Sequence, residues 1–312
     1  MQGNGWPRRA VVAAMAASAV GAGTARAQAV KWSAGEEKAT LKAPPNATDC
    51  HHHIYDSRFP IDPHATLKPG DATVADYRAL QRRIGTTRNV VVQPSTYGTD
   101  NRCTLDALAQ FGAAARGVAV VDTSVTDDEL HRLHAAGIRG IRFNLVQTGA
   151  TTVEMVAPLA ARIAPLGWHV QVHALSALIV GHATLWRDLP CQSVFDHMGH
   201  PRQPHGEQDP VVALLSDLAR QGKAWVKLSG AYMETKVGPP SYADITPVAR
   251  AYVAAAPERM VWGSDWPHPT EAVSHKPDDA ILFDLLGAWV PDEATRTRIL
   301  VDNPARLYGF PA

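Results

Sequence analysis

The chain carries two histidines, His51 and His53, that are spaced to act together on one substrate or one metal ion. They lie in the segment 48–56, which we interpret as the first β-strand of the fold. Successive side chains of a strand point to opposite faces, so both imidazoles share one face, with Asp49 below them. Imidazole nitrogens bind divalent metals and can polarise a substrate oxygen. The pattern therefore predicts a catalytic or metal-binding pair, with a surface histidine run as the alternative.

Further polar residues occur at regular intervals, each at the end of a short apolar run. They are Gln93, Ser95 and Tyr97; Arg142 and Asn144; His173; Asp196, His197 and His200; Lys227 and Ser229; and Asp265 with His268. The runs themselves are rich in Val, Ile and Ala, so the polar side chains indicate a catalytic rim above an apolar core. Asp265 stands in the turn 263–268, which has no evident packing role, and we interpret it as functional.

Three of these positions also have a structural interpretation. His173 could be a hydrogen-bonded core histidine, and Arg142 could pair with a buried carboxylate. Asp196 precedes His197 on the same run, so strand alternation predicts that it faces the surrounding helices and is structural.

The elements that must position these residues alternate along the chain. Predicted strands are 47–53, 88–93, 117–121, 140–144, 169–173, 193–197, 224–229 and 259–263. Predicted helices are 73–84, 104–115, 127–136, 153–166, 177–187, 210–221, 245–256 and 278–289, followed by a helical tail over 293–300 and 305–308. Eight strand–helix repeats predict a single-domain α/β fold, a closed (β/α)₈ TIM barrel over 47–312. The alternative, an open doubly wound sheet, is disfavoured because no GxGxxG turn follows the first strand.

Charge and cysteine content exclude several classes of protein. The formal net charge of the 312 residues is zero and 19% of them are charged, so nothing indicates a nucleic-acid partner. The three cysteines lack CxxC spacing, which argues against a disulfide framework and a cysteine zinc site, and leaves a lone disulfide open.

The N-terminus is predicted to be a targeting segment. Residues 1–27 combine the pair Arg8 and Arg9, a moderately apolar run, and Ala25-Arg26-Ala27, which is typical of a cleaved signal peptide of the twin-arginine type. The apolar run is shorter than the roughly 20 residues of a membrane span, so no stable span is expected after cleavage. Residues 28–46 are polar and form a leader arm. The expected location is the periplasm; an uncleaved anchor or a misassigned start are the alternatives.

The motifs quoted above resemble those of the amidohydrolase superfamily. Its first-strand Asp-x-His-x-His is similar to Asp49–His53, its histidines on the fifth and sixth strands to His173 and His197, and its eighth-strand aspartate to Asp265. Six stretches in order, 49–60, 90–102, 137–145, 195–201, 226–230 and 261–269, narrow the resemblance to the branch that contains 2-pyrone-4,6-dicarboxylate hydrolase and related lactone hydrolases and isomerases.

Two departures from the superfamily pattern limit what the resemblance implies. The fourth strand lacks the lysine that bridges two metals, so a dinuclear site is not expected. The resemblance then implies either one Zn²⁺ held by His51, His53, His173 and Asp265, or no obligatory metal, which we slightly favour. Thr148 replaces a second carboxylate-binding arginine, so we expect a lactone with one carboxylate.

The resulting hypothesis is a hydrolase that acts on a small anionic lactone. Asp265 is the expected general base, and His51, His53 and His197, which His173 could join, polarise the carbonyl. The expected substrate contacts are Arg142, Ser95, Tyr97, Asn101 and His268. Alternatives are a lactone isomerase, a metal-dependent decarboxylase and a non-catalytic exported sugar-acid binding protein. A homo-oligomer remains open.

Overall fold

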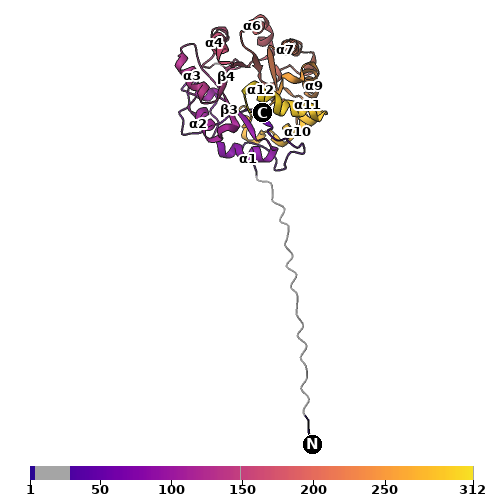
Figure 1. Cartoon of the computed structure of the whole chain (residues 1–312). Helices are drawn as coiled ribbons and strands as arrows, with labels where there is room; N and C mark the ends of the chain where they lie inside the picture. Colours follow the sequence, from indigo (N-terminus) through magenta and orange to yellow (C-terminus); the bar gives the residue numbers. More distant parts are fainter. Residues whose placement is uncertain (4–28, 148, 312) are drawn as a thin grey trace.

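A computed structural model describes residues 1–3, 29–147 and 149–311 of the chain. Eight parallel strands pair in sequence order around the molecule: β1 Thr48–His52, β2 Arg88–Val92, β3 Ala115–Ala119, β4 Ile138–Asn144, β5 His169–His173, β6 Ser193–Phe195, β7 Ala224–Leu228 and β8 Met260–Trp262. Helices surround this sheet on its outer face (Figure 1). The prediction of a single-domain (β/α)₈ barrel is confirmed.

The main helices follow the strands in the predicted order. They are α1 Val74–Ile84, α2 Arg102–Phe111, α3 Asp127–Ala135, α4 Val156–Ile163, α5 Ser176–Gly181, α6 Ala183–Asp188, α7 Pro210–Arg220, α8 Ala231–Glu234, α9 Thr246–Ala255, α10 Asp279–Trp289, α11 Glu293–Thr297 and α12 Asn303–Tyr308. The prediction of one continuous helix over 177–187 was wrong, because the segment is divided into α5 and α6 around His182. Gly181 ends α5, and glycine disfavours a continuous helix.

Local sequence signals begin and end these helices. Thr73 and Asp76 form a reciprocal capping box at the start of α1, and Gly85 ends the helix in a left-handed conformation with φ 86°. Asp209 accepts a hydrogen bond from the Val211 amide at the start of α7. These caps therefore define both ends of α1 and the start of α7.

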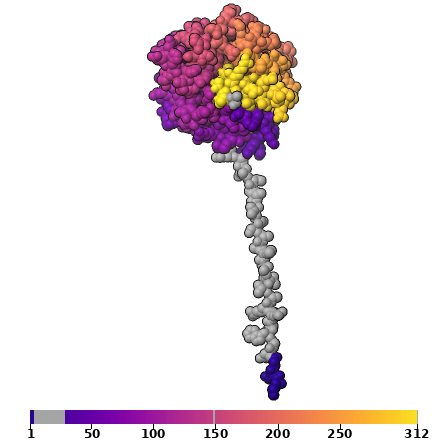
Figure 2. All heavy atoms as spheres, in the orientation of Figure 1, coloured from indigo at the N-terminus to yellow at the C-terminus, as the bar shows by residue number. Residues whose placement is uncertain are grey.

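The N-terminal end of the barrel is closed by the end of the chain. Leu307, Tyr308 and Phe310 pack against strand residues that face the barrel interior, including Val118 and Val261. Figure 2 shows this C-terminal segment in yellow on one face of the molecule, beside indigo atoms from the N-terminal part of the chain. Polar groups are therefore concentrated at the opposite, C-terminal ends of the strands.

The turn after β8 completes the barrel by pairing with β1. The Asp265 amide donates to the His51 carbonyl over 2.8 Å, and the His53 amide donates to the Trp266 carbonyl over 2.8 Å. Asp49, fully buried in β1, accepts from the Ser264 amide at 2.9 Å and from the Tyr77 hydroxyl at 3.0 Å. The same backbone bonds that close the sheet therefore hold Asp265 beside His51.

Replacing Asp49 with alanine is expected to destabilise the fold by about 3 kcal/mol or more, because it leaves buried donors without their acceptor, each costing about 1–3 kcal/mol. These donors are the amide and hydroxyl of Ser264, the His51 amide and the Tyr77 hydroxyl. Urea denaturation followed by circular dichroism measures the loss. Asp128→Ala, at an exposed position of α3, is the control and should stay close to wild type. A midpoint for the Asp49 variant equal to that of this control would contradict the assignment.

The leader arm packs against the barrel where it is described. The Trp266 indole donates to the Lys31 carbonyl at 2.8 Å, and Arg83 donates to the carbonyls of Ala34 and Glu37 at 2.8 and 2.7 Å. The arm thus contacts the same turn that carries Asp265. The signal peptide was predicted over residues 1–27, and its residues 4–27 lie outside the described part of the chain.

The cysteine and membrane expectations can be compared with the structure. Cys50, Cys103 and Cys191 are all free, so no disulfide forms among them. Within residues 1–3, 29–147 and 149–311, no helix combines the length and apolarity needed to cross a membrane.

Candidate active site

The C-terminal strand ends bring the predicted polar residues to one small volume. An inner cavity is lined by residues that include His53, Ser95, Arg142, His173, His197 and Asp265. This cavity measures about 30 Å³, which is enough for one or two water molecules. It adjoins a larger outer cavity of about 360 Å³, and Ser95 lines both.

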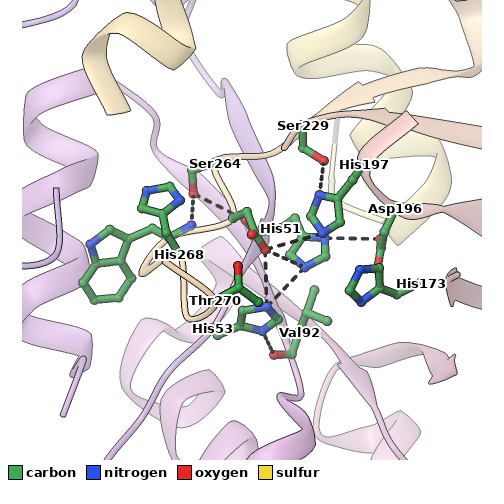
Figure 3. A network of polar contacts seen from close by, with 12 residues as sticks. His51, His53, Val92, His173, Asp196, His197, Ser229, Ser264, His268 and Thr270 are labelled. Atoms are coloured by element: carbon green, nitrogen blue, oxygen red, sulfur yellow. Dashed lines mark hydrogen bonds and ion pairs between the residues drawn. The ribbon is translucent and has the colours of Figure 1, made fainter. Parts of the chain in front are cut away.

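Three imidazoles converge on one carboxylate oxygen at the centre of the site (Figure 3). The Nε2 atoms of His51, His53 and His197 lie 3.3, 3.4 and 3.7 Å from Oδ1 of Asp265. Oδ2 of Asp265 accepts a hydrogen bond from the Tyr232 hydroxyl at 2.5 Å. Burial alone raises the pKa of Asp265, but His197 and His53 outweigh it and hold this pKa well below its usual range. The carboxylate is therefore ionised and faces the imidazoles.

The outer nitrogen of each imidazole has its own partner, which fixes the ring. His53 Nδ1 lies 2.8 Å from the Val92 carbonyl and His197 Nδ1 lies 2.9 Å from the Ser229 hydroxyl. His51 Nδ1 lies 3.3 Å from the Lys227 ammonium. Burial lowers the pKa of His197 to about 4, so this ring is neutral at pH 7. The arrangement leaves all three Nε2 atoms directed toward Asp265.

Asp196 faces the barrel interior, so the prediction that it faces the helices was wrong. Strand β6 ends at Phe195, and His197 adopts a left-handed conformation with φ 51°, which ends the alternation. Asp196 Oδ2 accepts from Gln171 at 3.0 Å and lies 3.4 Å from Arg142 Nε. Burial raises the pKa of Asp196, but Lys227, His51 and Arg142 together hold it well below its usual range. A buried, ionised carboxylate thus lies directly behind the imidazoles.

Two glycines allow the backbone to approach these rings closely. A Cβ atom at Gly263 would lie 2.6 Å from Cβ of His51, and one at Gly230 would lie 2.8 Å from Nδ1 of His197. Gly230 also has φ 68°, which other residues rarely adopt. The motifs Val226–Gly230 and Val261–Pro269 therefore contain glycine because the histidines occupy the space that a side chain would need.

Arg142 presents a guanidinium to the cavity. Its NH2 group lies 3.2 Å from His173 Nδ1, while its Nε lies toward Asp196. Ser95 lies across the cavity, where its hydroxyl accepts from the Asn144 amide at 2.7 Å. Arg142 therefore pairs with a buried carboxylate and also lines the cavity. A guanidinium in this position can bind a substrate carboxylate.

The chain matches the Amidohydrolase family over residues 48–310. It is 38% identical to a 2-pyrone-4,6-dicarboxylate hydrolase of Comamonas testosteroni, over 89% of this chain and 94% of that protein. This chain belongs to the amidohydrolase family. It is also 33% identical to a D-galactarolactone isomerase of Agrobacterium fabrum, over 85% of this chain and 91% of the relative. A solved apo structure from Agrobacterium tumefaciens superposes with a TM-score of 0.83 at 32% identity, covering 90% of this chain and 99% of that one.

Three predicted substrate contacts of this amidohydrolase lie elsewhere. The Tyr97 hydroxyl pairs with the backbone of Asp56, and the Asn101 amide pairs with the backbone of Val120 at 2.8 and 3.0 Å. His268 is buried, with Nε2 3.1 Å from both oxygens of Asp279. None of the three lines the inner cavity as the described residues form it. Their polar atoms form hydrogen bonds within the protein and do not point into the inner cavity.

Sequence reasoning missed several residues of the amidohydrolase site. Tyr232 binds Asp265, while Tyr55 and Met233 line the cavity. Lys227, which the sequence placed on the predicted rim, lies behind His51, and a lysine inside the apolar run 224–228 calls for such a buried partner. Thr148, which replaces an arginine of the dicarboxylate hydrolase pattern, lies outside the described residues.

The donor set of the amidohydrolase fits one metal ion by spacing. Nε2 of His51, Nε2 of His53 and Oδ1 of Asp265 form a triangle with sides of 3.3, 3.3 and 3.4 Å. Ligands of a tetrahedral zinc ion with bonds of about 2.0–2.1 Å lie roughly 3.3 Å apart. The ligand atoms of His51, His197 and Asp265 also lie within 4.8 Å of one another. His173, which the sequence also suggested as a ligand, has its Nδ1 3.2 Å from the NH2 group of Arg142.

Proposed function

We propose that this enzyme hydrolyses a small lactone that carries one carboxylate. The observation that supports this proposal is the position of the Asp265 carboxylate. It lies 3.3–3.7 Å from three imidazole nitrogens, in a cavity that Arg142 also lines. This arrangement offers a base, donors for an oxyanion and a cation for an anionic substrate. Relatives at 38% and 33% identity that act on lactones support the same reaction class. Membership of this enzyme family argues against the non-catalytic binding protein considered from the sequence.

Arg142 is the proposed anchor of the substrate. Its guanidinium binds the carboxylate through paired hydrogen bonds, while Ser95 contacts the ring substituents from the other side of the cavity. Ser95 lines both cavities, so the lactone ring occupies the outer one and its carbonyl enters the inner one. Of the described lining residues, Arg142 is the sole arginine, which supports a substrate with a single carboxylate.

Asp265 is the proposed general base. The inner cavity has room for one or two waters beside its carboxylate, which removes a proton as water adds to the carbonyl carbon. Imidazole N–H groups of the site face the oxygen that becomes negatively charged. The ring C–O bond then breaks, and the leaving oxygen takes up the proton that Asp265 received. If a substrate hydroxyl attacked in place of water, the lactone would migrate, and the D-galactarolactone isomerase relative favours that as the second candidate.

A panel of monocarboxylate and dicarboxylate lactones, assayed by proton release, tests the proposed reaction. Hydrolysis of a monocarboxylate lactone releases one proton per turnover. Rearranged products detected by NMR without acidification would instead identify an isomerase. Faster turnover of dicarboxylate lactones would contradict the single-carboxylate assignment.

We further propose that no metal is obligatory. A bound Zn²⁺, held by His51, His53 and Asp265, would act as a Lewis acid on the carbonyl. The site already contains two cations, Arg142 and Lys227, paired with Asp196. We expect kcat/KM to change by less than about twofold after prolonged chelation. One tightly held zinc per chain, with activity lost on its removal and restored by Zn²⁺, would overturn this proposal.

Export to the periplasm by a twin-arginine signal is a separate proposal, supported by Arg8, Arg9 and Ala25-Arg26-Ala27 in the sequence. Expression of the full chain in a bacterium should yield a periplasmic protein whose N-terminal sequence starts near Gln28. Arg8→Lys combined with Arg9→Lys should keep the chain in the cytoplasm. Unprocessed protein in the cytoplasm of cells expressing the wild-type chain would contradict the proposal.

A further inference from the structure

A chain of hydrogen bonds crosses the floor of the site from Lys227 to the backbone of β2. Lys227 Nζ lies 3.3 Å from His51 Nδ1, and His51 Nε2 lies 3.3 Å from His53 Nε2. His53 Nδ1 in turn lies 2.8 Å from the Val92 carbonyl oxygen. The side chains of Lys227 and His51 are fully buried, and His53 is 3% exposed. No water is needed to connect the four groups.

The two ends of this chain have fixed hydrogen-bonding roles. A lysine ammonium donates and cannot accept, and a carbonyl oxygen accepts and cannot donate. His51 Nδ1 must therefore accept from Lys227, and His53 Nδ1 must carry the hydrogen that Val92 accepts. A neutral imidazole holds one N–H hydrogen, so His51 carries it on Nε2 and His53 Nε2 is bare. In the contact between the two Nε2 atoms, His51 is then the donor and His53 the acceptor. The Lys227 end and the Val92 end of the chain therefore require the same direction of hydrogen bonding.

Asp196 is the competing partner for His51 Nδ1, and its geometry favours Lys227. Oδ1 of Asp196 lies 3.2 Å from Nδ1, yet this oxygen has no hydrogen-bond partner. The same oxygen lies 3.3 Å from Lys227 Nζ, and Gln171 holds the other carboxylate oxygen. Asp196 thus keeps the ammonium in place beside His51 by charge, without taking the hydrogen of the ring.

We infer that Lys227 is a positioning residue that sets the tautomers of the catalytic histidines. With its hydrogen on Nε2, His51 is the ring that donates to the substrate carbonyl oxygen, whereas the bare Nε2 of His53 can only accept a hydrogen bond. Lys227 does not line the inner cavity as the described residues form it, so it acts through His51. The same hydrogen opposes a metal ion at His51 Nε2, although the spacing of the ligands would admit one. The assignment of donor and acceptor to catalytic steps rests on the proposed function.

The tautomers can be measured without any substrate. The protein, labelled with ¹⁵N in its histidines, is examined at pH 8 by long-range ¹H–¹⁵N correlation, and the His51 signals are identified by their loss in His51→Gln. The inference predicts that His51 carries hydrogen on Nε2 and His53 carries it on Nδ1. Hydrogen on Nδ1 of His51 in the wild-type protein would overturn the inference, even if the enzyme proves to be a lactonase. A failed lactone assay would leave this spectroscopic test unaffected.

Two variants separate tautomer control from a general structural role. Lys227→Met keeps the apolar stem and removes the donor, so His51 should shift its hydrogen to Nδ1, toward Asp196. We expect kcat to fall by about 10²-fold with little change in KM, as for the loss of one oxyanion donor. Lys227→Arg retains a cationic donor and should keep the wild-type tautomer and most of the activity. Zn²⁺ titration followed by calorimetry should show tighter binding to Lys227→Met than to wild type.

The contrary results are equally specific. An unchanged His51 tautomer in folded Lys227→Met would remove Lys227 from the inference. Equal losses of kcat in the methionine and arginine variants, with unchanged tautomers, would indicate a packing role. If Lys227→Met does not fold, the wild-type spectrum alone decides.

Discussion

Replacing Asp265 with asparagine is expected to lower kcat for lactone hydrolysis by about 10²–10⁴-fold, the usual contribution of a general base. The amide keeps the size of the side chain and its bond with Tyr232, but it cannot take a proton from water. The backbone of the turn should remain in place, because its amide donates to the His51 carbonyl independently of the side chain. Stopped-flow measurement of proton release with a lactone substrate gives kcat directly.

The Asp265 prediction has a matched control and a pH dependence. Asp128→Asn makes the same chemical change at an exposed position of α3 and should leave kcat unchanged. The pKa of Asp265 lies well below its usual range, so the base is already ionised at neutral pH. Lowering the pH from 8 to 6 should therefore not protonate Asp265, and protonation of this base should not lower kcat over that range. Asp265→Asn with full activity would show that another group activates the water.

Replacing Arg142 with lysine is expected to raise KM by about 10–100-fold, because a point charge replaces the planar fork that binds a carboxylate through two hydrogen bonds. Lysine still offers a positive charge to Asp196, which limits the damage to the buried network. The value of kcat should change much less, since Arg142 contacts the substrate carboxylate and not the proposed reacting carbonyl. Steady-state kinetics over a wide range of substrate concentration separates the two parameters.

The Arg142 prediction is tested further with an uncharged substrate. A lactone that lacks the carboxylate should be hydrolysed equally slowly by wild type and by Arg142→Lys, because the lost interaction is then absent from both. Arg102→Lys, at an exposed arginine paired with Asp100, is the matched control for the substitution itself. A KM that is unchanged in Arg142→Lys for the anionic lactone would exclude Arg142 as its anchor.

The fold was predictable because its signals are local. Continuous apolar runs such as Val90–Val92 have the composition of strands buried on both faces, and caps such as Thr73 and Gly85 define the helices between them. The break between α5 and α6 was missed because Gly181 costs a helix only about 1 kcal/mol, which the surrounding sequence usually outweighs.

The site was predictable in part, and the omissions have a physical reason. His51 and His53 share a face because strand alternation is a local rule. Asp196 was misplaced because that rule ends at His197, where the backbone becomes left-handed and the side chain lies against Gly230. Lys227 and His51 are 176 residues apart, so their contact depends on closure of the barrel and on no pattern within either segment.

Tyr97, Asn101 and His268 illustrate the reverse difficulty. Their residue types suit substrate binding and the support of loops equally well, and their positions follow strand ends in both cases. In the structure the hydroxyl of Tyr97 and the amide of Asn101 bind backbone groups, and His268 binds Asp279. Buried backbone groups need hydrogen-bond partners. Tyr97 and Asn101 serve as such partners, although the sequence suggested that they bind substrate.

The measurement that tests the central claim most directly is turnover of a monocarboxylate lactone in water enriched in ¹⁸O, with wild type and Asp265→Asn compared side by side. The account predicts that the wild-type enzyme releases one proton and incorporates one ¹⁸O atom into the new carboxylate per turnover, and that the asparagine variant does neither at a comparable rate. A rearranged lactone without ¹⁸O, or equal incorporation by the two proteins, would contradict hydrolysis by water that Asp265 activates.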